Sequence, residues 1–91
     1  MQFMVIERFR DGDATPVYER FAAEGRLMPD GIDYVASWVS ADLTTCFQIM
    51  QADDAALLQQ WVAAGSDIVD FEISPGVTGD EAASAVLREV P

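Results

Sequence analysis

The chain has 91 residues, of which 51% are apolar, and its sixteen acidic residues outweigh five basic ones to give a net charge of −11. This size and composition predict one folded domain over residues 1–91 and argue against disorder. The acidic charge argues against binding to nucleic acid or to an anionic membrane surface, because both partners attract clustered Lys and Arg. The chain has no His, Lys or Asn, which excludes a His-ligated haem, a Lys Schiff base and the common His-bearing metal sites.

The single cysteine and the hydropathy pattern indicate the cellular compartment of the protein. Cys46 cannot form an internal disulfide, and it cannot make a zinc site by itself. No apolar run approaches the roughly 20 residues that span a bilayer, and the first residues lack the basic region of a secretory signal. These features predict a cytoplasmic protein without a metal or other cofactor.

The first predicted elements are a strand and a helix. The strand covers Gln2 to Phe9 and ends at the turn signal of residues 10–13. The helix has Thr15 as its expected N-cap and Pro16 at its first position, and Gly25 lies at or near its end. A turn at Pro29, Asp30 and Gly31 leads into the next strand.

Two strands and a second helix occupy the middle of the chain. The strands cover residues 32–39 and 45–51, and the connection between them has the length of a hairpin. Asp53 or Asp54 is expected to cap the helix that follows, and Gly65 is expected to end it.

The last predicted strand covers residues 68–74 and ends at Pro75 and Gly76. Thr78 and Glu81 then form a capping box that predicts a short C-terminal helix. The resulting β-α-β-β-α-β-α order, with right-handed crossovers, is that of an α+β ferredoxin-like fold with a four-stranded antiparallel sheet.

Each predicted strand carries apolar side chains on both faces, whereas the two helices can cover only one face. One alternating set is almost wholly apolar and is expected beneath the helices: Val5, Val35, Val39, Phe47, Ile49, Val69, Phe71 and Ile73. The other set is mixed and is expected on the helix-free face: Met4, Ile6, Arg8, Tyr34, Ala36, Trp38, Cys46, Gln48, Met50, Ile68, Asp70 and Glu72. Burying its five large apolar side chains contributes on the order of 10 kcal/mol, so we expect a second copy to cover this face. The predicted homodimer encloses a space for a small-molecule ligand.

Six stretches of the chain resemble a family of short prokaryotic proteins catalogued as a domain of unknown function. They are F-M-V-I-E-R-F at 3–9, V-Y-E-R-F at 17–21, G-R-L-M-P-D-G at 25–31, Y-V-A-S-W-V at 34–39, C-F-Q-I-M at 46–50 and D-I-V-D-F-E at 67–72. The resemblance covers nearly the whole chain. It implies a dimeric α+β barrel, a superfamily that includes monooxygenases, muconolactone isomerase and chlorite-dismutase-like haem proteins, and it implies no particular activity.

Seven side chains of the expected helix-free face are the candidate ligand-binding residues: Arg8, Tyr34, Trp38, Cys46, Gln48, Asp70 and Glu72. An interior Arg8 could orient a carboxylate or an enolate, while Asp70 or Glu72 with a raised pKa acts as a base. Trp38 and Tyr34 could stack on an aromatic ligand.

Each candidate also has a structural interpretation, which the sequence favours. Arg8 with an acidic partner more often forms an ion pair that fixes a register or a dimer contact, and aromatic side chains more often fill an interface. Cys46 has no cationic neighbour in sequence and is favoured as an inert buried thiol. Three functions stay open: a small-molecule-binding homodimer, which we favour, a cofactor-independent isomerase or monooxygenase-like enzyme, and a structural subunit with a filled core.

Overall fold

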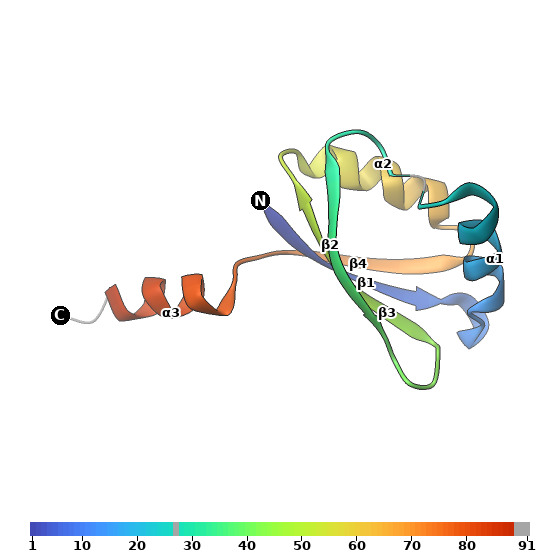
Figure 1. Cartoon of the computed structure of the whole chain (residues 1–91), viewed down its shortest axis with the longest axis horizontal. Coiled ribbons are helices and arrows are strands. Elements are labelled where there is room, and N and C mark those ends of the chain that lie inside the picture. The colour runs from blue at the N-terminus through green and yellow to red at the C-terminus, as the bar shows by residue number, and fades with distance from the viewer. Residues whose placement is uncertain (27, 89–91) are drawn as a thin grey trace.

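The computed structural model describes residues 1–26 and 28–88. Over these residues the chain forms one four-stranded antiparallel sheet with helices packed on one of its faces (Figure 1). In chain order the elements are β1 (Gln2–Phe9), the 3₁₀-helix η1 (Arg10–Gly12), α1 (Thr15–Glu24), β2 (Ile32–Val39), β3 (Thr45–Ala52), α2 (Ala55–Gly65), β4 (Val69–Gly76) and α3 (Gly79–Arg88). The strands lie in the order β2-β3-β1-β4, which confirms the predicted ferredoxin-like α+β fold. No helix within the described ranges is long and apolar enough to cross a membrane.

The start of α1 differs from the prediction by one residue. Ala14, not Thr15, occupies the N-cap, and the Asp13 carboxylate accepts the Thr15 N–H at 2.9 Å. The proline of the first turn is confirmed, because Pro16 has no N–H that would need a partner there. Gly25 ends the helix with φ 73°, a conformation that favours glycine.

The other two helices begin where the capping signals predict. The Asp54 carboxylate accepts the Ala56 N–H at 2.9 Å and so caps α2, which ends at Gly65. The Thr78 hydroxyl accepts the Glu81 N–H at 3.0 Å and donates to the Glu81 carboxylate at 3.1 Å. Both arrangements satisfy backbone donors that the first turn of a helix leaves unpaired.

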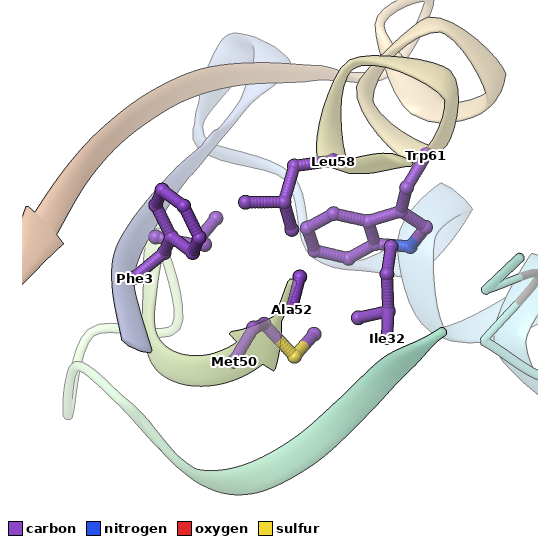
Figure 2. Close-up of a cluster of buried hydrophobic side chains, with 7 residues drawn as sticks. Phe3, Ile32, Met50, Ala52, Leu58 and Trp61 are labelled. Carbon is purple, nitrogen blue, oxygen red and sulfur yellow. The ribbon is translucent and has the colours of Figure 1, made fainter. Parts of the chain in front are cut away.

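The tightest part of the core lies between α2 and the sheet. Leu58 and Trp61 project from α2 toward Phe3 of β1 and Met50 of β3 (Figure 2). The whole cluster comprises Phe3, Val5, Ile32, Met50, Ala52, Leu58 and Trp61. A smaller buried cluster beneath α1 comprises Phe9, Cys46 and Val69, with partly buried neighbours that include Ala14, Val17, Val39 and Ile68.

The facing of β3 is opposite to the prediction. Its buried side chains, which face the helices, are Cys46, Gln48, Met50 and Ala52. Phe47 and Ile49, expected beneath the helices, lie on the helix-free face instead, where Ile6 and Met4 of β1 are their partners. The prediction was wrong because β3 carries apolar side chains at both parities, so hydrophobicity alone does not select the face.

A β-bulge changes the facing within β2. The register shifts at Val35, which was expected beneath the helices and is instead exposed in the bulge. Tyr34, before the bulge, pairs with Met50 and lies on the helix side, which corrects its predicted position. Trp38, beyond the bulge, pairs with Phe47 on the helix-free face, as predicted.

The facing of β1 and β4 follows the prediction. Val5 pairs with Ile73 on the helix side, while Arg8 pairs with Asp70 on the other face. Ile68 precedes β4 and packs into the small cluster beneath α1, so it does not belong to the helix-free face.

Both edges of the sheet are irregular. At one edge, β4 extends beyond its predicted end, since Pro75 pairs with Phe3 and Gly76 with Gln2. Proline is tolerated in an edge strand because the missing N–H breaks no ladder between two strands. At the other edge lies β2 with the bulge at Val35.

Two rows of apolar side chains cross the helix-free side of the sheet. One row holds Trp38, Phe47 and Ile6, and the other holds Ala36, Ile49 and Met4. Trp38 is 68% exposed and Phe47 is 46% exposed, so the described part of the chain leaves these rows in contact with solvent. We call these six residues the open face.

Candidate functional site

A pocket of about 250 Å³ lies between the sheet, α1 and the C-terminal end of α2. Its apolar walls include Phe9, Val17, Phe21, Trp61, Ile68 and Phe71. The pocket exists because α1 buries none of its side chains and leaves a gap above the sheet. A cavity of about 150 Å³ accommodates benzene, so this volume suits a substituted ring.

Three polar side chains from β1 and β3 form the floor of the pocket: Glu7, Cys46 and Gln48. Glu7 is 9% exposed and Gln48 is 4% exposed. The Gln48 Nε2 donates a hydrogen bond to Glu7 Oε2, and Gln48 Oε1 has no partner within the described part of the chain. A buried acceptor without a donor costs about 1–3 kcal/mol, so this oxygen marks a position where a ligand donor would be stabilising.

The floor is electrostatically unusual. Burial raises the pKa of Glu7 above its usual value, while hydrogen bonds from Cys46 and Gln48 and the charge of Arg26 act in the opposite direction. Burial, followed by the neighbouring Glu7 carboxylate, raises the pKa of Cys46 to about 12. The thiol is therefore protonated at neutral pH, which agrees with its interpretation as an inert cysteine.

Arg26 places a positive charge at the mouth of the pocket. Its guanidinium carbon lies 3.8 Å from the centroid of the Tyr34 ring and 5.1 Å from that of Phe21, distances typical of cation–π contacts. The Trp61 indole N–H donates to the Arg26 carbonyl at 3.0 Å. These contacts hold Arg26 between α1, α2 and β2.

The seven predicted residues do not form one site. Arg8, Trp38, Asp70 and Glu72 lie on the helix-free side, whereas Tyr34, Cys46 and Gln48 lie on the helix side. The physical reasons are the bulge in β2 and the parity of β3 described above. Among the seven, only Cys46 and Gln48 line the pocket.

The acidic residues near Arg8 form ion pairs at the surface. Arg8 lies 3.5 Å from the Glu72 carboxylate, and Arg10 lies 3.1 Å from that of Asp70. All four side chains are more than half exposed. Exposed pairs of this kind contribute little stability, and their geometry fits the structural interpretation given to Arg8.

Sequence reasoning missed Glu7, although β1 contains a signal for it. Glu7 occupies the same parity as Phe3, Val5 and Phe9, which makes it a charged residue within a row of apolar ones. Charged side chains are rarely buried unless they have a partner. The combination points to a polar site beneath the helices.

A family model described as a domain of unknown function, DUF3303, matches residues 1–90. Among solved structures, the chain is similar to the crystal structure of the protein Atu4242 from Agrobacterium tumefaciens, determined by structural genomics, at 14% identity and a TM-score of 0.47. That match covers 87% of this chain and 96% of the other. No curated protein matches the sequence.

Proposed function

Because the chain belongs to the DUF3303 family of domains of unknown function, we propose a function from its own geometry: it binds a small aromatic molecule that carries a hydroxyl group. The observation that carries this proposal is the Gln48 Oε1 atom, which is buried at the pocket floor without a hydrogen-bond donor. Binding sites are usually apolar pockets with a few polar groups that fix the ligand's orientation. The pocket beneath α1 has this composition.

The ligand chemistry follows from the groups that line the pocket. A hydroxyl can donate to Gln48 Oε1, while the ring contacts the aromatic side chains of Phe9, Phe21 and Phe71. Arg26 at the mouth favours a neutral or anionic ligand over a cationic one. The pocket therefore favours a phenol or naphthol with a neutral or acidic substituent.

A pair of probes that differ in one donor tests the proposal. We expect 2-naphthol to raise the melting temperature of the full chain and 2-methoxynaphthalene, which lacks the O–H, to raise it much less. Gln48→Met should abolish the difference between the two probes. Gln51→Met is the matched control, because it makes the same substitution in β3 on the other face of the sheet. Equal shifts with both probes, or a full response in Gln48→Met, would contradict the role of the amide.

Glu7 favours a second candidate, the cofactor-independent enzyme. A buried carboxyl with a raised pKa is the kind of group that accepts a proton from a bound substrate. The enzyme function predicts slow conversion of a bound hydroxyaromatic compound, detected by mass spectrometry. Glu7→Gln should stop this conversion and retain binding, whereas binding without conversion identifies a binding protein.

The open face supports the homodimer. Its two apolar rows have the ion pairs Arg8–Glu72 and Arg10–Asp70 nearby, and an apolar centre with a polar rim is typical of protein interfaces. No described segment of the subunit lies on the open face. A second copy presents the same apolar surface and could cover it.

Sedimentation equilibrium tests the homodimer. The wild-type chain should sediment as a dimer at micromolar concentration, and Phe47→Glu should sediment as a folded monomer, since Phe47 is half exposed in one subunit. Gln59→Glu adds the same charge on the exposed surface of α2 and should leave the dimer intact. A monomeric wild-type chain would refute the proposal, and a dimer that binds no probe would favour the structural subunit.

A further inference from the structure

The C-terminal helix α3 is well formed yet isolated from the rest of the subunit. In Figure 1 it projects away from the sheet and the other helices, and none of its described residues is buried. The described chain is accordingly 53 Å long and only 17 Å thick. A helix of ten residues is below the roughly 12–15 residues at which isolated helices become marginally stable in water, so α3 requires a surface to pack on.

The sequence of α3 divides cleanly into two faces. At 100° per residue, the apolar residues Ala82, Ala83, Val86 and Leu87 fall on one face. The opposite face carries Asp80, Glu81, Ser84 and Arg88. Val86 and Leu87 are both about two-thirds exposed. Within the described residues, the apolar face of α3 is thus bare, as the open face is.

The two surfaces are continuous along the chain. At the end of the sheet, Pro75 of β4 pairs with Phe3 and Gly76 pairs with Gln2. The helix α3 begins three residues after Gly76. A partner that lies on the open face is therefore next to the point where α3 leaves the subunit.

The area of the open side of the sheet shows why α3 matters for a dimer. Four strands of eight residues present a face of about 500 Å², given about 4.8 Å between strands and about 3.3 Å per residue. Two paired faces bury about 1,000 Å², less than the roughly 1,600 Å² of a standard interface. A ten-residue helix is about 15 Å long and about 10 Å wide, so two helices that pack across the dimer supply about the missing area.

We infer that α3 is an arm that packs against a second copy of this chain, beside that copy's open face. The inference rests on the homodimer proposed above. The apolar residues of α3 contact the partner, and its polar residues stay in solvent. Each subunit then contributes one sheet face and one arm to a two-fold interface.

Two glutamate variants within α3 test the arm by sedimentation equilibrium of the full chain. Leu87→Glu places a charge on the apolar face and should weaken the dimer about tenfold or more, as expected when a leucine contact is lost. Ser84→Glu adds the same charge on the polar face of the same helix and should leave the dissociation constant within about twofold.

A paramagnetic label shows where the arm lies. A nitroxide on Ser84→Cys, in a Cys46→Ala chain without nitrogen-15, is mixed with an unlabelled chain that carries nitrogen-15. We expect broadening of amide signals around the partner's sheet, which only a contact between copies produces. The mixture with the Phe47→Glu chain should show no such broadening.

The outcomes separate the arm from the homodimer. If the wild-type chain is a monomer, both proposals fail together. If the chain is a dimer in which Leu87→Glu and Ser84→Glu behave alike, the arm is wrong and the homodimer stands. If the mixture is dimeric and the nitrogen-15 chain shows no broadening, α3 does not contact the partner, which also overturns the arm.

Discussion

The two halves of the helix layer rest on the same strands but differ in how they are held. Beneath α2, β1 and β3 contribute Phe3 and Met50, and Leu58 and Trp61 close the space above them. Beneath α1, the same two strands contribute the polar floor of the pocket, and no α1 residue is buried. The α2 half is a packed core, whereas the α1 half is an open site.

Polar contacts add to the limited apolar packing of α1, in which partly buried residues such as Val17 take part. The Arg20 guanidinium donates two hydrogen bonds to the Asp67 carboxylate, at 2.8 and 2.7 Å, and so links α1 to the segment after α2. Bidentate pairs of this kind fix orientation as well as distance. The tightly packed core and the pocket therefore lie at different ends of one sheet.

The largest effect on stability should come from a substitution that leaves a cavity in the core beneath α2. Leu58→Ala removes a side chain that is 1% exposed and should lower the free energy of unfolding by about 3 kcal/mol. Phe21→Ala, in the pocket wall, removes a half-exposed ring and should cost about 1 kcal/mol. Urea titration followed by circular dichroism measures both. Equal losses would mean that the two halves are packed alike.

A smaller effect is expected where the halves meet. Trp61 belongs to the α2 core and also lines the pocket, and its indole N–H bonds to the Arg26 carbonyl. Trp61→Phe keeps an aromatic ring and removes the donor, so we expect a loss of about 1 kcal/mol and weaker binding of 2-naphthol. If only one of the two measurements changes, Trp61 does not join the halves.

Most substitutions of buried residues destabilise a protein, but one in the polar floor is expected to stabilise it, by an amount that depends on pH. The folded pKa of Glu7 is raised, so its protonated form is favoured in the fold, and stability is lost as the pH rises through that pKa. Glu7→Gln does not titrate. It should match the wild-type chain below the usual pKa of 4.5 and exceed it by on the order of 1 kcal/mol at neutral pH. Unfolding curves at a series of pH values check this, and a gap that narrows as the pH rises contradicts it.

The smallest and most local effect concerns the ion pair that holds α1. The hydrogen bond from Arg20 lowers the pKa of Asp67 to about 2, so the pair stabilises the fold above the usual Asp pKa of 3.8 and this is lost as the pH falls through about 2. Asp67→Asn should speed hydrogen exchange of α1 amides at neutral pH and leave those of α2 unchanged. Faster exchange in both helices would show that the pair supports the whole fold.

Much of the fold could be predicted from the sequence because its signals are local. The prolines, glycines and capping residues mark the ends of each element, and Asp54 and Thr78 act as those signals indicate. The facing of β3 could not be predicted in this way. Phe47 and Ile49 are as apolar as Met50, so either face of the strand could pack beneath the helices.

The candidate site was harder to predict because it depends on contacts between strands distant in sequence. Glu7 and Gln48 meet on the pocket floor only through the pairing of β1 with β3. Tyr34 and Trp38 lie on opposite faces of the sheet because of a single extra residue at Val35. The amino-acid composition of the strand does not indicate this bulge. The homodimer and the binding roles of the predicted residues stay predictions.

The irregular edges of the sheet restrict how this protein can assemble. An additional strand would need a continuous row of free N–H and C=O groups, and Pro75 interrupts that row along β4 while the bulge at Val35 interrupts it along β2. Fibre-like growth by strand addition is therefore disfavoured at both sides. The proposed homodimer joins two sheet faces and uses no strand edge, so it would close after two molecules without polymerising.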